Sequence, residues 1–269
     1  MKKLNVPAKS RGVVLFAFNT DNIKYVQIAE QAARLIHHIL NLPVTLITDI
    51  EHNSSQFDQI IIIDNNLENS HPGTTRIWRN GDRYRAYELS PYDETILIDT
   101  DYLILDKNLL KLFEQDFDYR IMTHNQRPDI VWTDRMGIYG LEYQWATVIL
   151  FRKTLPAKML FDLAGRVQRN YRYYMNLYHI SANNFRNDYA FTIANNILNG
   201  YDQGMKQGVP WTMLTFANLV KSMTLNKGLI TIKEPTTAHM IPQQNIHIMD
   251  KEYLLSDDFN RFVETVCQN

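Results

Sequence analysis

The sequence has little cysteine and no excess of either charge, and each absence excludes a class of protein. Its 269 residues contain one cysteine, Cys267. One cysteine cannot form a disulfide within the chain or build a zinc site from thiolates, and this favours a reducing cytoplasm. The 28 basic and 29 acidic side chains give a formal net charge of −1. A uniformly basic nucleic-acid coat protein is therefore excluded, but a local basic face is not.

Long apolar runs are also missing. Residues 1–10 carry three lysines without the apolar run of a signal peptide after them. The longest apolar stretches have the length of strands, so we expect no transmembrane helix and no membrane partner. Apolar residues make up 45 % and charged residues 21 %, as in ordinary soluble proteins with a packed core. With no repeats and no linker, we expect a single domain over 1–269, with halves at 1–120 and 121–269.

Short apolar runs alternate with helical patterns in the first half. A helix is predicted over 22–40, with shorter helices at 82–89 and 107–113 and a loop at 68–81. Buried strands are predicted for GVVLFAF (12–18), PVTLIT (43–48), QIIII (59–63) and TILI (95–98). This alternation predicts an α/β fold with a mixed, mainly parallel central sheet flanked by helices. Farther on, we expect strands at 120–122, 144–152 and 229–233 and helices at 157–178 and 187–198.

The sharpest motif is a pair of aspartates, Asp99 and Asp101, at the end of the fourth strand. Open α/β sheets place ligands beyond the carboxyl ends of their strands, and residues i and i+2 of a strand face the same way. Both carboxylates would then approach one cation, for which oxygen ligands favour Mg²⁺ or Mn²⁺. An EF-hand is excluded by Leu103 and Ile104 at its third ligand and glycine positions. The pattern is short, and a chance copy is the alternative.

The order of these elements resembles that of GT-A glycosyltransferases, which have an α/β half, an apolar strand ending in D-x-D, and a later strand like 145–153. Trp78-Arg79-Asn80 and the segments 83–93 and 95–101 are similar to glycosyltransferase-like proteins of T-even-type bacteriophages. The resemblance implies a GT-A-like, Rossmann-like fold in which 1–120 binds a nucleotide sugar, with a UDP-sugar favoured, and 121–269 faces the acceptor. It implies that Asp99 and Asp101 bind Mn²⁺ or Mg²⁺ against the diphosphate, in a host cytoplasm if the source is a phage.

The resemblance also implies a further metal ligand near the C-terminus. GT-A enzymes often use a histidine there, and His247 and His239 are the candidates. We prefer His247 because Lys251 follows it, and a histidine with a nearby lysine suits a metal and a diphosphate together. The glycogenin-like branch has a glycine between these two residues, where Met249 and Asp250 stand here. The alternative is that both histidines are ordinary packed or surface residues.

Donor-binding candidates follow the first two strands and precede the D-x-D strand. By the resemblance, the residues that meet the nucleotide are Phe18, Asn19, Thr20, Tyr25 and Asp49. Thr20 or Asp21 has the alternative role of capping the following helix. Arginine suits phosphate, and of Arg76, Arg79, Arg83 and Arg85 we choose Arg83, which opens the resembling segment. The alternative for the others is a solvated charged face.

The acceptor candidates lie in the second half. Asp188 begins a predicted helix, so it either stabilises that helix end or serves, with Asp101, as a catalytic carboxylate near an oxocarbenium-like sugar. Arginines and tyrosines interleave over 165–186, as in nucleic-acid interfaces. We choose Arg166, Arg169, Arg172 and Tyr173 from this segment. Together with the phage resemblance they suggest a 5-hydroxymethylpyrimidine of phage DNA as acceptor, which requires access to the base. The alternative is a solvated face with core tyrosines.

Two other functions remain open. D-x-D also occurs in phosphatases and phosphotransferases, although Leu103 replaces the expected Thr or Val and three strands precede the motif here. A nucleotide- or DNA-binding module without catalysis would keep the same fold.

Overall fold

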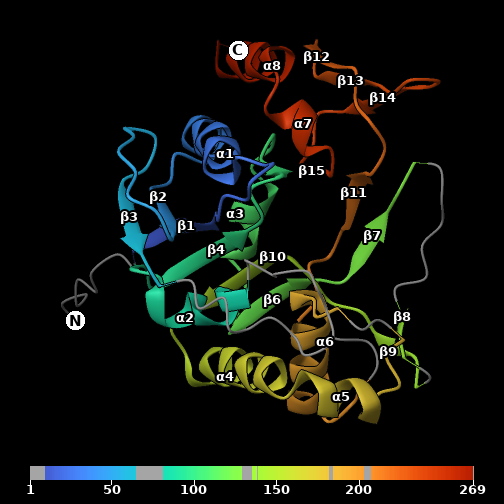
Figure 1. The fold of residues 1–269 in the computed structure, drawn as a ribbon. Coiled ribbons are helices and arrows are strands. Elements are labelled where there is room, and N and C mark those ends of the chain that lie inside the picture. The colour runs from blue at the N-terminus through green and yellow to red at the C-terminus, as the bar shows by residue number, and fades with distance from the viewer. Residues whose placement is uncertain are drawn as a thin grey trace, which may run out of the picture.

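A computed structural model describes residues 10–64, 81–128, 135–137, 139–181, 184–202 and 207–268. Its centre is a six-stranded sheet in the order β3-β2-β1-β4-β10-β6 (Figure 1). The strands are β1 (Arg11–Phe16), β2 (Val44–Thr48), β3 (Gln59–Ile62), β4 (Glu94–Ile98), β6 (Tyr119–Met122) and β10 (Trp145–Arg152). β1 is parallel to β2 and β4, and β2 to β3, whereas β10 is antiparallel to β4 and β6. The sheet is therefore mixed and mainly parallel, as predicted.

The carboxyl ends of β1, β2 and β4 meet at one edge of this sheet. Leu15 of β1 is in register with Leu46 of β2 on one side and Ile98 of β4 on the other. The strand order therefore reverses between β1 and β4. In open α/β sheets such a reversal opens the crevice that holds the ligand. The loop after β1 and the turn after β4 both leave the sheet at this point.

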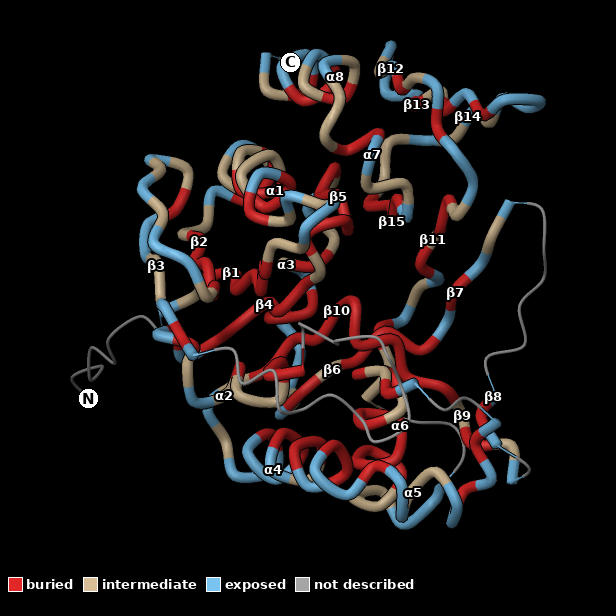
Figure 2. The backbone as a smooth tube through the Cα atoms, viewed as in Figure 1, coloured by how far each residue is buried: buried red, intermediate tan, exposed pale blue. Residues whose placement is uncertain are grey.

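Helices cover both faces of the central sheet (Figure 1). α1 (Tyr25–Leu40) buries its apolar face on one side, and α4 (Leu155–Arg169) and α6 (Asn187–Leu198) pack together on the other. Figure 2 shows β1, β4 and β10 buried and the outer sides of α4 and α5 exposed. The other helices are the 3₁₀ helix η2 (Gly81–Arg85), α2 (Ala86–Leu89), α3 (Asn108–Leu112), α5 (Tyr171–Leu177), α7 (Lys251–Leu254) and α8 (Asp257–Gln268).

The C-terminal third adds further sheets. β11 (Thr212–Phe216) lies between β7 (His124–Gln126) and β15 (Ile246–Ile248) and is parallel to both, while β15 is antiparallel to β5 (Tyr102–Leu103). An antiparallel sheet of β12 (Ser222–Asn226), β13 (Leu229–Lys233) and β14 (Ala238–Pro242) packs on α8. β8 (Arg135–Met136) pairs with β9 (Leu141–Glu142). Because β5 directly follows the D-x-D motif, its pairing with β15 brings the C-terminal region to that motif.

Three predicted elements differ in detail from the structure. The first helix begins at Tyr25 rather than at residue 22, because the chain first makes a turn over 20–23. The helix expected over 157–178 is divided at Asn170, whose φ of −119° and ψ of 30° leave the helical region. QIIII forms the outermost strand of the described sheet rather than a buried one, so Ile62 is 54 % exposed. Most of the predicted loop, 68–80, lies outside the described residues.

Among the residues that the structure describes, no helix combines the length and the apolar composition needed to cross a bilayer.

Candidate active site

The D-x-D motif forms a tight turn at the carboxyl end of β4. The Asp99 N–H donates to the Thr147 carbonyl at 3.0 Å, and the Tyr102 N–H donates to the Asp99 carbonyl at 3.1 Å. β4 ends at Ile98, so the two aspartates are not part of the regular strand on which the same-face expectation rested. As a result, the two carboxylates have different partners.

The Asp99 carboxylate pairs with the guanidinium of Arg83. Arg83 Nη1 lies 2.8 Å from Asp99 Oδ1, and Nη2 donates to the Ala146 carbonyl at 2.6 Å. The Arg83 side chain is 1 % exposed, so it does not belong to a solvated face. Burial raises the pKa of Asp99, and the Arg83 charge opposes this rise. Arg85 instead lies near Asp82.

Arg76 and Arg79, together with the Trp78-Arg79-Asn80 segment, lie outside the described residues.

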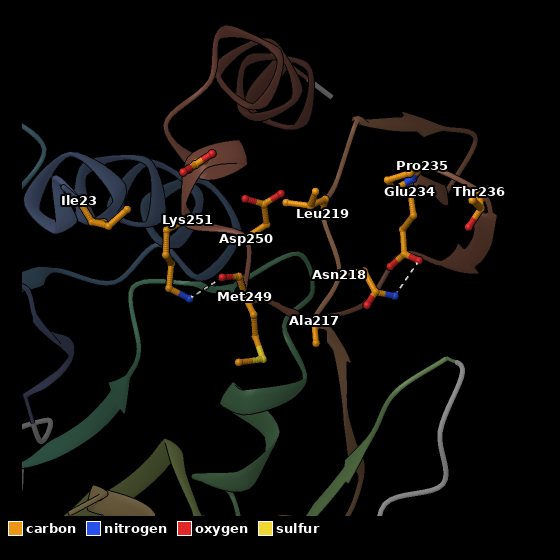
Figure 3. Close-up of a pocket in the computed structure, with 11 residues that line it drawn as sticks. Ile23, Ala217, Asn218, Leu219, Glu234, Pro235, Thr236, Met249, Asp250 and Lys251 are labelled. Atoms are coloured by element: carbon orange, nitrogen blue, oxygen red, sulfur yellow. Dashed lines mark hydrogen bonds between the residues drawn. The ribbon is translucent and has the colours of Figure 1, made fainter. Parts of the chain in front are cut away.

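The Asp101 carboxylate pairs with two basic side chains from the C-terminal region. Its Oδ2 accepts a hydrogen bond from Lys251 Nζ and lies 3.3 Å from His247 Nε2. Burial alone would raise the pKa of Asp101, but Lys251 and His247 outweigh it and lower this pKa. Lys251 also donates to the Met249 carbonyl at 3.2 Å (Figure 3). The turn after β4 therefore gathers two carboxylates, one guanidinium, one ammonium and one imidazole.

Thr215 and Asn125 orient the His247 ring from its Nδ1 side, which faces away from Asp101. β11 and β15 place Thr215 opposite His247, and the Thr215 hydroxyl lies 3.2 Å from His247 Nδ1. That hydroxyl donates its proton to Asn125 Oδ1 at 2.6 Å. Its bond to His247 therefore requires Nδ1 to be the donor, so Nε2 faces Asp101 and either donates to it when the ring is charged or carries a lone pair when the ring is neutral. Histidines that bind metals are oriented in this way.

His239 lies in a neighbouring cluster. Its Nε2 is 3.5 Å from Glu234 Oε2, and its ring centroid is 5.6 Å from that of Phe216. Of the two candidate histidines, the structure brings His247 to Asp101. In the described parts of the chain, no three carboxylate, imidazole or thiolate groups are close enough together to hold a metal ion. Asp101 and His247 supply two such groups, while Asp99 is turned to Arg83.

Asn19 and Thr20 organise the turn before α1. The Val26 N–H donates to Asn19 Oδ1 at 3.0 Å, and the Ile23 N–H donates to Thr20 Oγ1 at 2.9 Å. The expected capping role is wrong for both Thr20 and Asp21: Thr20 closes the turn that precedes α1, and Asn19 is the residue that binds an N–H of the first helical turn. Asp21 is exposed, and Lys24 rather than Asp21 precedes the first helical residue.

The other nucleotide candidates lie around the same edge of the sheet. Tyr25 is the first residue of α1, and its phenol lies close enough to the site for three charged side chains to act on it. Burial raises the pKa of Tyr25, Lys251 lowers it, and both motif aspartates raise it further. Phe18 is buried, with its ring centroid 6.2 Å from that of Phe16. Asp49 is half-buried directly after β2.

The Asp188 carboxylate connects the first turn of α6 to the beginning of strand β10. Its Oδ1 accepts from the Ala146 N–H at 2.9 Å, and its Oδ2 accepts from Arg186 Nη2 at 2.6 Å. Ala146 therefore binds Asp188 through its N–H and Arg83 through its carbonyl. The Asp188 charge raises the pKa of Asp99, so the carboxylate lies near the motif as well as in the first turn of a helix.

Sequence reasoning missed several residues that support this site, namely Thr215, Asn125, Ala146 and Tyr143. Burial and the adjacent Asp188 raise the pKa of Tyr143. None of these residues belongs to a motif, because each is placed by strand pairing or by packing.

The basic and aromatic candidates are on the outer surface of α4 and α5. Arg166, Arg169, Arg172 and Tyr173 are all exposed, and the Arg169 guanidinium lies 5.6 Å from the Tyr84 ring centroid. Neighbouring Tyr171 and Tyr178 are core residues. In Figure 1, α4 and α5 lie across the sheet from α7 and β15.

A cavity of about 820 Å³ opens beside Lys251 (Figure 3). Ile23, Leu219 and Met249 contribute apolar surface, and Glu234 and Asp250 contribute carboxylates. Asp250 accepts from the Val220 N–H at 2.8 Å and the Tyr253 N–H at 3.0 Å, so it holds the cavity wall and caps α7. Lys251, which binds Asp101, therefore also borders a space large enough for a small organic substrate.

Comparisons with known proteins found similarities of shape but not of sequence. No family model and no curated relative matches the chain. The glycosyltransferase GlyE of Streptococcus pneumoniae is 15 % identical, with a TM-score of 0.43 over 77 % of this chain and 45 % of that one. This chain thus spans less than half of GlyE.

Two other solved structures are similar to a comparable degree. The galactosyltransferase LgtC, in complex with donor and acceptor sugar analogues, is 17 % identical, with a TM-score of 0.47 over 68 % of this chain and 70 % of that one. Mouse xyloside xylosyltransferase 1 is 11 % identical, with a TM-score of 0.45 over 71 % of this chain and 83 % of that one.

Proposed function

We propose that this protein is a glycosyltransferase that moves a sugar from a nucleoside-diphosphate sugar to an acceptor hydroxyl. The observation that carries the proposal is the placement of Asp99 and Asp101 where the strand order reverses, with Arg83, His247 and Lys251 around them. The carboxylates at this edge suit a cation and the basic side chains beside them suit a phosphate, so the site suits a ligand that contains both. A nucleotide sugar bound with a divalent metal has this composition.

We propose that Asp101 and His247 hold Mn²⁺ or Mg²⁺, and that Asp99 would have to bring its second carboxylate oxygen to them, because the described residues hold no ready group of three ligands. Asp101 supplies a carboxylate with a lowered pKa, and His247 supplies an imidazole whose Nδ1 is tied back by Thr215. When bound, the metal would neutralise charge on the leaving nucleoside diphosphate. Lys251 and the metal would compete for Asp101, so we expect Lys251 to turn to the diphosphate when the cation binds.

The chain's own residues would act on three parts of the donor. We propose that Tyr25, the loop residues Phe18, Asn19 and Thr20, and Asp49 border the nucleotide, with UDP favoured. Lys251 would hold the diphosphate, because basic side chains donate to phosphate oxygens. Arg83, which is buried and bonded to Asp99 and the Ala146 carbonyl, would position Asp99 instead.

Asp188 would act on the sugar. As the bond from the anomeric carbon to the diphosphate oxygen breaks, the electron pair leaves with the diphosphate and the sugar becomes positively charged; an acceptor oxygen then bonds to that carbon and gives its proton to the released diphosphate. Both Asp188 oxygens already accept hydrogen bonds. We therefore propose that Asp188 stabilises this charge through its position rather than by taking the proton.

A nucleic-acid acceptor is the finer part of the proposal. The exposed arginines of α4 and α5 lie beside the exposed Tyr173, as expected for a face that binds a phosphate backbone. We propose that this face, which lies across the sheet from α7 and β15, holds the backbone of duplex DNA bearing hydroxymethylated pyrimidines at a distance from the motif. Replacing Arg166, Arg169 and Arg172 together by Glu should abolish binding of such a duplex at low salt. Unchanged binding by that variant would refute the DNA acceptor and leave the transferase proposal standing.

Calorimetry with UDP tests the donor site. We expect UDP to bind in the presence of Mn²⁺, to bind much more weakly without it, and to lose the metal-dependent part in Asp101→Asn. Asp162→Asn is the matched control, because Asp162 is an exposed carboxylate on α4 that pairs with Lys158. GDP serves as a second nucleotide. If neither nucleotide shows metal-dependent binding, the motif has no donor role.

The two alternatives predict other results. A D-x-D phosphatase would release phosphate from p-nitrophenyl phosphate with Mg²⁺ and lose this activity in Asp99→Asn. A non-catalytic module would bind UDP but never consume a UDP-sugar.

A further inference from the structure

A second cavity lies away from the D-x-D motif. It has a volume of about 390 Å³ and is formed by the hairpin of β8 and β9, the end of α5 and the chain after α6. Figure 1 shows this region on the opposite side of the molecule from α7 and β15. Its volume falls within the range of small-ligand pockets. None of its residues takes part in the site described above.

Large apolar surfaces line this cavity and are open to solvent. Tyr139 is 60 % and Tyr201 48 % exposed, and Leu177 lies beside them. Tyr178, buried at the end of α5, shares a hydrogen bond between hydroxyls with Tyr201. Phenol rings offer an apolar face with a polar edge. A ligand with both apolar and hydroxylated surfaces would match them.

The charged groups of the cavity are acidic. Glu142 and Asp202 line it, and no lysine, arginine or histidine is among its described lining residues. Such a lining disfavours phosphates and nucleotides. Glu142 Oε2 is buried and has no hydrogen-bond partner among the residues that the structure describes. A buried acceptor of this kind is stabilised when a donor such as a hydroxyl reaches it.

The Tyr201 ring is held in place by an unusual backbone. Tyr201 has a φ of 62°, in the left-handed region that non-glycine residues seldom adopt. Its N–H donates to the Asn196 carbonyl at 2.8 Å, and its hydroxyl is tied to Tyr178. Conformations of this kind persist where the surroundings enforce them, often at ligand sites. The hydroxyl bond to Tyr178 restrains the Tyr201 ring before any ligand arrives, which reduces the entropy lost on binding.

We propose that this cavity binds a neutral saccharide. Tyr139 and Tyr201 would pack against the apolar face of a sugar ring, and Glu142 and Asp202 would accept hydrogen bonds from its hydroxyls. The proposal does not depend on the transferase activity, because it involves none of the donor-site residues. It gives the molecule a sugar-binding site separate from the D-x-D motif.

Saturation-transfer NMR on the full chain, without metal or nucleotide, tests this proposal. The probes are lactose, cellobiose and N,N′-diacetylchitobiose, each at ~10 mM, a concentration suited to a dissociation constant near 1 mM. We expect at least one of them to receive saturation and to lose it in both Tyr139→Ala and Tyr201→Ala. Tyr173→Ala, at an exposed tyrosine outside the cavity, should bind like the parent protein. Asp101→Asn should also bind normally, which separates this site from the donor site.

Two results would overturn the proposal. One is the absence of saturation for every probe, or saturation that survives both cavity variants. The other is displacement of the bound sugar from the parent protein by UDP but not by a second saccharide, which would place the sugar in the donor site. Tyr139→Ala keeps the test valid if Tyr201→Ala fails to fold, because the Tyr139 side chain is mostly exposed.

Discussion

Replacing Arg83 by methionine should destabilise the protein, although Arg83 belongs to the candidate site. The change leaves the Asp99 carboxylate without the guanidinium 2.8 Å away and removes the donor 2.6 Å from the Ala146 carbonyl. Removing one partner of a buried ion pair costs about 3–5 kcal/mol. Asp99 is 29 % exposed, so water compensates in part, and we expect a loss near the lower end, about 3 kcal/mol.

Differential scanning calorimetry measures this effect. An unfolding entropy of about 2.1 cal/mol/K per residue gives about 0.56 kcal/mol/K for this chain, so about 3 kcal/mol lowers the Tm by about 5 °C. The control Arg172→Met changes an exposed arginine and should alter stability by less than about 0.5 kcal/mol. Adding Asp99→Asn to Arg83→Met should recover at least about 1 kcal/mol, because the unpaired charge is then gone. Equal Tm values for Arg83→Met and Arg172→Met would refute the buried pair.

Three further predictions follow from other contacts. Lys251→Met should weaken UDP binding with Mn²⁺ by about tenfold or more in calorimetry, because a charge-assisted hydrogen bond contributes about 1.5–3 kcal/mol. Burial raises the pKa of Glu94, but its two paired arginines lower this pKa below the usual value. The ionised carboxylate therefore stabilises the fold fully above the unfolded pKa of about 4.3, and this contribution is lost as the pH falls below that value. In Glu94→Gln, the urea concentration at the unfolding midpoint should therefore depend less on pH in the acid range. Gly12→Ala would place Cβ 2.2 Å from Tyr92 Cζ and should cost about 1–3 kcal/mol in urea unfolding. An unchanged value in any of these assays contradicts the contact concerned.

The central sheet could be predicted from the sequence because its signals are local. Runs such as GVVLFAF and TILI are apolar on both faces and are followed by Asn or Asp, as buried parallel strands require. The carboxyl ends of such strands share one edge, so Asn19, Asp49 and Asp99 could be placed together before any contact was known. The sequence does not show that QIIII is the outermost strand, because strand order depends on long-range pairing.

The surroundings of the two aspartates were only partly predictable. The preference for His247 rested on its spacing from Lys251, and both residues do lie at Asp101. The support of His247 by Thr215 and Asn125 was invisible, because β11, β15 and β7 are far apart in the chain. A strand of three residues such as β15 is too short to carry a periodic signal, and it forms here because β5 and β11 flank it.

Arginines and tyrosines near each other in sequence turned out to have different environments. Arg83 is almost completely buried, whereas Arg85 is partly exposed in the same short helix. In the segment rich in arginine and tyrosine, Tyr171 packs in the core and Tyr173 faces solvent. Composition identifies such a segment, but the packing of each helix decides which side chains face outward.

The most direct test of the central proposal is turnover of the donor. UDP release from UDP-glucose and UDP-galactose should be measured with Mn²⁺, with and without hydroxymethylated duplex DNA, for the parent protein, Asp101→Asn and the control Asp162→Asn. We predict that the parent protein and the control release UDP from at least one donor and that Asp101→Asn does not. If the parent protein releases no UDP although it binds the nucleotide, or if Asp101→Asn releases UDP as fast as the parent, the proposed transferase site is contradicted.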